Sequence, residues 1–149
     1  MIHDGSPRLP DPHETLALPD LALSTELERQ SWQPGETIGG VLRLTNHSAT
    51  ETIRLETGNP TTGVLLDISG ASILGGFAGW IAGVGRFIEL EPGDVDTVDF
   101  LAGSEAVGAP RGTLLPPGAY LLSVRLRVSS GGSGHLLIAP PAPVRLDTA

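Results

Sequence analysis

The sequence predicts an all-β protein, built as one antiparallel β-sandwich of about seven to nine strands. Three observations lead to this fold class. Apolar residues recur at every second position over most of the chain, turn signals separate these runs about every ten residues, and no run shows the spacing of a helix. The 149 residues, 40% of them hydrophobic, suit a single domain with a buried core.

The first twenty residues are predicted to form a proline-rich, flexible arm outside the sandwich. Pro7, Pro10, Pro12 and Pro19 fall in this segment, and proline neither completes a strand ladder nor continues a helix. The β-sandwich domain is therefore expected over residues 21–146.

Within that domain the strands are predicted from alternation. In the first of them, Leu21, Leu23 and Leu27 share one face. The clearest alternation runs from Tyr120 to Val128, with apolar residues at even positions and mainly polar ones at odd positions. About eight strands are expected, near residues 21–30, 36–46, 51–57, 63–69, 86–90, 95–102, 119–129 and 134–146.

Turn chemistry supports these boundaries, because proline presets one turn dihedral and glycine accepts the positive φ that follows. Asn46-His47-Ser48 also fits a glycosylation sequon, but the chain shows no secretory signal and we interpret the tripeptide as a turn. The turn signals are Gln33-Pro34-Gly35, Asn46-His47-Ser48, Gly58-Asn59-Pro60, Glu91-Pro92-Gly93, Pro116-Pro117-Gly118 and Gly131-Gly132-Ser133-Gly134.

Tyr120 stands just inside a strand, directly after a Pro–Gly turn. In immunoglobulin-like sandwiches a tyrosine at such a place donates its hydroxyl to the backbone across the corner. The alternative is an ordinary half-buried strand tyrosine, and the residues alone leave both open.

Charge and composition exclude several functions. All 9 basic residues are arginine and stand against 17 acids, so a formal charge of -8 argues against binding nucleic acid. The absence of cysteine excludes disulfides, thiolate zinc sites and a cysteine nucleophile. With no secretory signal in view, we expect a cytoplasmic location.

No constellation in the sequence predicts catalysis, a metal or a cofactor, so we expect a protein that is not an enzyme. There is no G-x-S-x-G elbow, Walker A motif or G-x-G-x-x-G opening a helix, and His3, His13, His47 and His135 lie apart from one another. Asp94, Asp96 and Asp99 offer carboxylate oxygens of the kind that bind calcium. No loop residue at the right offset completes the coordination of the ion. We interpret them as an acidic strand edge that resists aggregation.

Residues 68–85 form an uncharged, glycine-rich segment whose role stays open at this point. One reading is a short membrane helix, but the run is at the short limit for spanning and holds many glycines, so we expect no membrane span. A second is a crossover loop or hairpin that caps the core. A third is an exposed apolar lip that docks a partner protein, with candidate binding residues Phe77, Gly79, Trp80 and Ile81. The sequence leaves open whether Trp32 lies at the same end of the sandwich as this segment or at the opposite end.

Several short motifs in order resemble the intracellular proteinase inhibitor (BsuPI) family of immunoglobulin-like domains. Together they cover roughly residues 21–128. They are Pro34-Gly35-Glu36, Leu44-Thr45-Asn46, Ile53-Arg54-Leu55, Leu66-Asp67 with Gly70, Trp80, Leu90-Glu91-Pro92-Gly93 and Pro117-Gly118-Ala119-Tyr120.

The resemblance implies a non-catalytic protein that binds a serine protease by placing a loop or edge in its cleft. An arrestin-like or other immunoglobulin-like module is a competing resemblance through residues 34–40. The alternative function is a structural or accessory module that binds another protein, or forms a homo-oligomer, through residues 68–85, and contact with a membrane is a weaker option.

Overall fold

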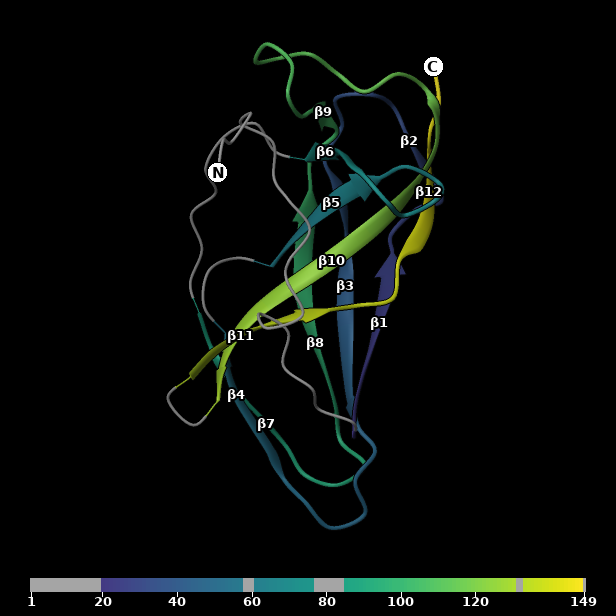
Figure 1. Ribbon diagram of the computed structural model, residues 1–149. Helices are drawn as coiled ribbons and strands as arrows, with labels where there is room; N and C mark the ends of the chain where they lie inside the picture. The colour runs from purple at the N-terminus through teal and green to yellow at the C-terminus, as the bar shows by residue number, and fades with distance from the viewer. Residues whose placement is uncertain (1–19, 58–60, 77–84, 131–132, 149) are drawn as a thin grey trace.

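The computed structural model describes residues 20–57, 61–76, 85–130 and 133–148 (Figure 1). These residues contain strands and no helix, and they form an immunoglobulin-like β-sandwich, which confirms the predicted fold class. The strands are β1 (Leu21–Leu27), β2 (Ser31–Trp32), β3 (Ile38–Asn46), β4 (Ile53–Thr57), β5 (Thr62–Leu66), β6 (Ile73–Gly76), β7 (Phe87–Leu90), β8 (Val95–Ala102), β9 (Glu105–Ala106), β10 (Gly118–Ser130), β11 (Ser133–Ile138) and β12 (Ala142–Leu146).

The strands form one curled sheet that closes over itself in two layers. Hydrogen-bonded neighbours run in the order β1-β3-β8-β5-β10-β12-β2. The long strand β10 also pairs with β11 and with β4, and β4 in turn pairs with β7. Figure 1 shows β10 crossing at an angle in front of β3 and β8. The core therefore lies between the layer of β1, β3 and β8 and the layer built around β10.

The predicted alternation of β10 is confirmed by its burial. Its even-numbered residues from Tyr120 to Val128 are all buried in the core cluster, together with Leu42 of β3 and Phe100 of β8. Its odd-numbered residues point to the outer face, because successive side chains of a strand point to opposite sides.

Each predicted range contains a strand, but the last one is wrong in detail. The expected strand at 134–146 is two strands, β11 and β12, because Pro140 and Pro141 lie between them and cannot donate to a ladder. The short strands β2, β6 and β9 were not expected, since runs this brief carry no readable alternation. The β5–β8 and β12–β2 pairings are parallel, whereas the sequence led us to expect antiparallel pairing throughout.

The uncharged segment lies only partly within the described residues. Asp67 to Ser72 form a turn, and Ile73–Gly76 form β6, which pairs with β5 and β9. In the part of the chain that the structure describes, no helix has the length and apolarity to cross a membrane. The predicted arm at 1–20 lies outside the described residues except for Asp20.

Candidate functional site

A groove of about 690 Å³ opens between strands β1 and β12, which lie side by side in Figure 1. The two strands belong to different layers, so the groove follows the seam where the sandwich is open. Apolar side chains dominate its lining, and Arg29 and Arg145 stand at its rim. The apolar lining residues include Leu27, Ile68, Ala119, Leu121, Pro143 and Val144.

Strand β1 presents a free backbone edge to this groove. Among the described residues it pairs with β3 alone. The Glu28 N–H donates to the Gly39 carbonyl at 3.2 Å, and the His47 N–H donates to the Asp20 carbonyl at 2.7 Å. Even-numbered residues of β1 therefore bond to β3, because bonding alternates along an antiparallel pair. The N–H and C=O groups of Leu21, Leu23, Thr25 and Leu27 point to the open side.

Strand β12, across the groove, has a blocked edge. The Asp147 N–H donates to the Trp32 carbonyl at 2.8 Å, so odd-numbered residues of this segment point away from β10. Pro143 shares that parity and has no N–H to offer. An incoming strand therefore finds a continuous set of donors and acceptors on β1 and an interrupted one on β12.

Thr25 places a polar group inside the groove lining. Its Oγ1 is buried and has no hydrogen-bond partner. A buried hydroxyl without a partner costs about 1–3 kcal/mol. A bound segment that supplied a partner for this hydroxyl would recover that energy.

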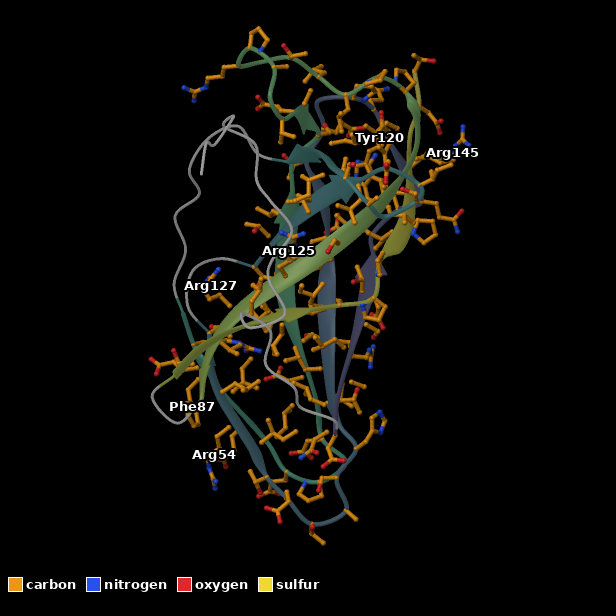
Figure 2. The ribbon with its side chains drawn as sticks, viewed as in Figure 1. Arg54, Phe87, Tyr120, Arg125, Arg127 and Arg145 are labelled. Carbon is orange, nitrogen blue, oxygen red and sulfur yellow. The ribbon has the colours of Figure 1, made fainter. Side chains whose placement is uncertain are left out.

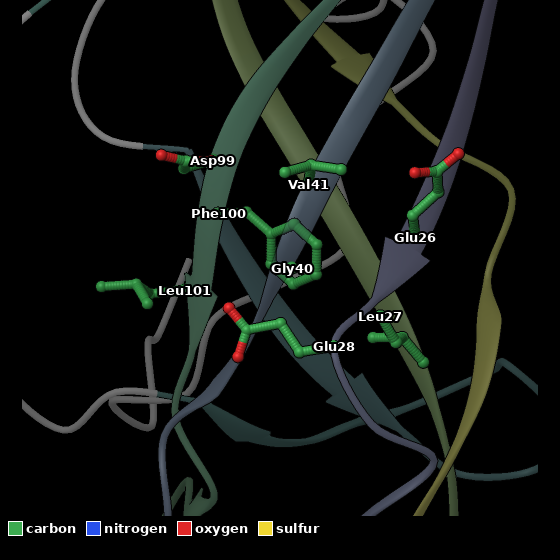
Figure 3. A pocket seen from close by; sticks show the side chains of 8 residues that line it. All are labelled: Glu26, Leu27, Glu28, Gly40, Val41, Asp99, Phe100 and Leu101. Carbon is green, nitrogen blue, oxygen red and sulfur yellow. The ribbon is translucent and has the colours of Figure 1, made fainter.

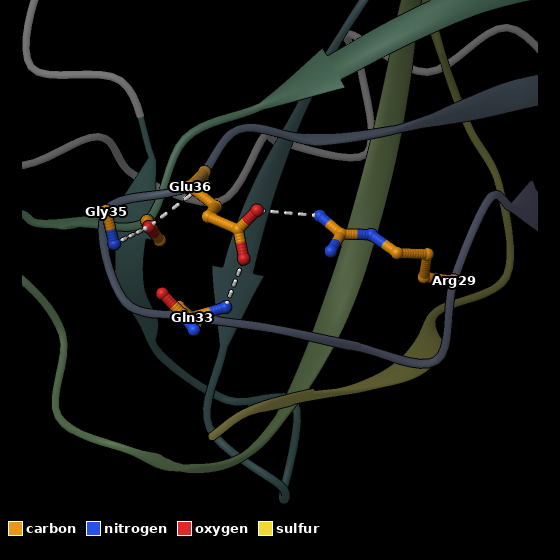
Figure 4. Close-up of polar contacts among 5 residues, drawn as sticks. Arg29, Gln33, Gly35 and Glu36 are labelled. Carbon is orange, nitrogen blue, oxygen red and sulfur yellow. Dashed lines mark hydrogen bonds and ion pairs between the residues drawn. The ribbon is translucent and has the colours of Figure 1, made fainter. Parts of the chain in front are cut away.

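Arg29 is held in place at the end of the groove by the turn that follows β2 (Figure 4). Its guanidinium donates to the Glu36 carboxylate at 2.9 Å and lies 5.2 Å from the centroid of the Trp32 ring. The Gln33 N–H donates to the same carboxylate at 2.7 Å. That backbone hydrogen bond and the Arg29 side chain together lower the pKa of Glu36. The buried Trp32 thus underlies this end of the groove.

Ser104 connects the same turn to the segment after β8. Its hydroxyl accepts from the Gly35 N–H at 2.8 Å and donates to the Glu36 carbonyl at 3.2 Å. Ser104 is buried, so both groups are satisfied away from water. The Pro34-Gly35-Glu36 motif therefore has a structural role in this chain.

Tyr120 lines the groove and forms the tyrosine corner. Its hydroxyl donates to the Pro116 carbonyl at 2.6 Å, which confirms the corner and not the ordinary strand tyrosine. Burial raises the pKa of Tyr120.

A second hollow, of about 380 Å³, lies on the outer face of β1, β3 and β8 (Figure 3). Glu26, Glu28 and Asp99 line it, and Glu26 is occupied by an ion pair to Arg43 at 2.7 Å. No group of three or more potential metal ligands gathers among the described residues.

The aspartates of the predicted acidic edge are placed separately. Asp94 accepts from the Glu91 N–H within its turn, Asp96 pairs with Arg86, and Asp99 is exposed beside Phe100. Along residues 95–100, β8 pairs with β3 on one side and with no second strand among the described residues, and β5 joins its other side only at Leu101 and Ala102.

The predicted binding residues Phe77, Gly79, Trp80 and Ile81 lie outside the described residues. The groove itself was not predicted. The alternation of apolar and polar residues predicted a strand at β1, but this pattern does not distinguish an edge strand from a central one. The proline at 143 was the one signal that β12 has a limited edge.

The fold and the groove define an immunoglobulin-like β-sandwich in which the edge of β1 is open and rich in donors among the described residues. No protein-family model matches the chain, and no curated protein matches it either. Among solved structures, the chain is similar to Spo0M, a sporulation control protein from Bacillus subtilis, with 13% identity and a TM-score of 0.46 over 89% of this chain and 51% of that one. The chain thus spans about half the length of Spo0M. It is also similar to PapD-like domain 7 of human CEP192, with 16% identity and a TM-score of 0.36 over 96% of each chain.

Proposed function

We propose that this chain is a non-catalytic protein-binding domain that takes up an extended segment of a partner protein as an added strand along β1. The observation that carries the proposal is the free edge of β1, whose outward N–H and C=O groups face an apolar groove. Strand addition of this kind uses main-chain hydrogen bonds for affinity and side-chain pockets for specificity.

The groove supports a partner with alternating side chains. A strand beside β1 would direct every second side chain toward the apolar lining around Leu27, Ala119 and Val144. The Thr25 hydroxyl would accept or donate one hydrogen bond to it. The charge of -8 also favours a polypeptide over a polyanion as the partner.

The test uses an array of random eight-residue peptides, with binding measured for the wild-type chain and for Thr25→Pro. The Thr25 N–H points away from β3, so the proline keeps the β1–β3 ladder but removes an edge donor. We expect selection of peptides with alternating apolar residues, and about tenfold weaker binding by Thr25→Pro.

Two control variants make this test specific. Thr25→Val removes the hydroxyl and keeps the N–H, so it should weaken binding less than the proline does. Ser24→Pro removes a donor that bonds to β3 and should lower stability instead. Equal peptide binding by wild type and Thr25→Pro, with both folded, would refute strand addition at β1.

A narrower candidate is inhibition of a subtilisin-like serine protease, which rests on the resemblance to the BsuPI family. In this proposal Phe77, Gly79, Trp80 and Ile81 form the lip that enters the protease cleft. The purified chain should slow peptide hydrolysis by subtilisin, and a Phe77→Ser/Trp80→Ser variant should not. If micromolar protein leaves the rate unchanged, inhibition is excluded while strand addition at β1 still stands.

Self-association through residues 68–85 is the remaining alternative. It predicts a gel-filtration volume that shifts with concentration and loses that shift in the same double variant. The proposal places the protein in the cytoplasm, which cell fractionation would test.

A further inference from the structure

The acidic side chains of β1 lie on the face of the strand that points away from the groove. Successive side chains of a strand point to opposite sides, and the leucines of β1 pack against the core cluster. Glu26 and Glu28 have the other parity, so they point to the outer face, where both line the hollow of about 380 Å³ (Figure 3).

The groove on the other side of β1 has the opposite charge. Arg29 and Arg145 line it together with apolar side chains, and no aspartate or glutamate among the described residues does so. Figure 2 shows Arg145 near Tyr120, at the start of β10. Strand β1 therefore separates a groove that suits apolar side chains from an outer face that carries carboxylates.

Two rows of residues across β1, β3 and β8 make up the outer hollow. Glu26 pairs with Val41 of β3, and Val41 pairs with Asp99 of β8. In the second row the Glu28 N–H donates to the Gly39 carbonyl at 3.2 Å, and a Cβ added at Gly39 would lie 3.2 Å from the Glu28 Oε1. Because Gly39 has no side chain, the Glu28 carboxylate lies over β3.

Cations are scarce on this outer face. Arg43 is the one arginine of β1, β3 and β8, and it pairs with Glu26 at 2.7 Å. In the part of the chain that the structure describes, no ion pair involves Glu28 or Asp99. The arginines labelled in Figure 2 belong to β4, β10 and β12. A face of this kind attracts a cationic partner and repels an acidic one.

A strand added along β1 would place every second side chain on this outer face. The outward N–H and C=O groups of β1 belong to its odd-numbered residues, so an antiparallel segment bonds at those positions. Residues opposite Glu26 and Glu28 then form non-hydrogen-bonded pairs, in which the side chains are closest. A cation at these positions is stabilised by the carboxylate beside it, and a further carboxylate is repelled.

We propose that the segment bound along β1 alternates apolar residues, which face the groove, with arginine or lysine at the positions beside Glu26 and Glu28. This inference rests on the proposed strand addition and adds the chemical class of the partner, a basic and apolar extended segment. Thr25 supports a segment at this edge independently of charge, because its buried Oγ1 has no hydrogen-bond partner.

The experiment compares three eight-residue peptides with valine at every second position and arginine, glutamine or glutamate at the others. Both ends are capped, so that no terminal charge contributes. Dissociation constants for the full chain are measured by fluorescence anisotropy at physiological salt. We expect the arginine peptide to bind about tenfold more tightly than the glutamine peptide, and the glutamate peptide to bind most weakly.

Charge variants locate the preference on the outer face of β1. Glu28→Gln should reduce the preference for arginine over glutamine to about threefold, and Glu28→Lys should reverse it in favour of glutamate. Glu91→Gln is the matched control, because it removes the same charge from an exposed position. Glu91 lies in the turn whose Gly93 N–H donates to the Asn46 carbonyl, and Asn46 pairs with Leu21 at the far end of β1. Seven strand residues span about 23 Å, well beyond a screening length of about 8 Å, so this control should keep the tenfold preference.

The outcomes separate this proposal from strand addition itself. Equal binding of the three peptides by the wild type, or a preference for arginine that Glu28→Gln leaves unchanged, would overturn the basic partner. If Thr25→Pro then weakens the binding of all three peptides, strand addition at β1 still stands. If no peptide binds, or if the wild type and Thr25→Pro bind all three alike, strand addition fails and the basic partner fails with it.

Discussion

The side-chain amide of Asn46 donates to the backbone carbonyl of Leu90 at 2.9 Å, 44 residues away in the sequence. Its Nδ2 also donates to the Glu51 carbonyl at 2.8 Å, and its Oδ1 accepts from the Ser48 N–H at 2.9 Å. Asn46 is fully buried, so one side chain ties the end of β3 to the approach to β4 and the end of β7. The sequon at this position is therefore a structural turn, as predicted.

Replacing Asn46 with Asp should lower the free energy of unfolding by about 2–4 kcal/mol. Asp keeps the acceptor oxygen but loses both donated hydrogen bonds and places a carboxylate against the carbonyls of Glu51 and Leu90. Urea denaturation measures the change. His47→Ala is the control, because the His47 side chain is exposed and its substitution should change little. Equal effects of the two variants would contradict the role assigned to Asn46.

Gly40 is required by close packing between β1, β3 and β8. A Cβ at this position would overlap the Glu26 carbonyl oxygen and lie 2.9 Å from Cε2 of the buried Phe100 ring. Gly40→Ala should therefore destabilise the fold by about 1–3 kcal/mol, measured by the melting temperature or by urea. Gly134→Ala, where a Cβ meets nothing within 4 Å, is the matched strand control and should be neutral or stabilising.

Tyr120→Phe should cost about 1–2 kcal/mol, because it removes the 2.6 Å hydrogen bond to the Pro116 carbonyl and leaves the ring in place. Thermal unfolding measures the loss. Phe87→Leu is a control at an exposed strand position and should change the melting temperature little. If Tyr120→Phe is as stable as the wild type, the hydrogen bond from the Tyr120 hydroxyl makes no net contribution to the free energy of unfolding.

Tyr120 also makes stability depend on alkaline pH. Burial raises its pKa in the folded state, so the folded protein resists ionisation. This contribution is fully present below the pKa of an unfolded tyrosine, about 10, and is lost as pH rises through the higher folded value. Tyr120 is the one tyrosine of the chain, so ultraviolet absorbance of tyrosinate follows it alone. We expect its midpoint above that of free tyrosine in the folded protein and a normal midpoint in urea.

Asp67 should make the turn before β6 sensitive to acid. Its Oδ1 accepts from the Ser69 hydroxyl at 2.8 Å and from the Ala71 N–H at 3.0 Å. The Ser69 hydrogen bond and then the backbone N–H groups lower the pKa of Asp67. The turn is therefore stabilised above the usual aspartate pKa, about 3.9, and loosens as pH falls through the lower folded value. The Ala71 amide shift against pH reports this directly, and Asp67→Ala should abolish the titration.

Local patterns were enough for much of the fold. Alternation from Tyr120 to Val128 identified the central strand and its core face, and the Pro–Gly turn before Tyr120 indicated the corner. They were not enough for β2 and β9, whose two residues each have no period, or for the break at Pro140 and Pro141 that separates β11 from β12. The candidate groove could not be predicted either, because Thr25 and Pro143, on its two sides, are 118 positions apart in the sequence.

What the amino-acid sequence determined by itself is the strand content, the buried faces and the turns, since each depends on residues within a few positions of one another. Only the tertiary structure decided which backbone groups stay unpaired. Whether the outward N–H and C=O groups of Thr25 have a strand beside them depends on how β3, β8 and β10 pair. That pairing joins residues far apart in the sequence, so no local pattern predicts it. The open edge of β1 is a consequence of this long-range pairing.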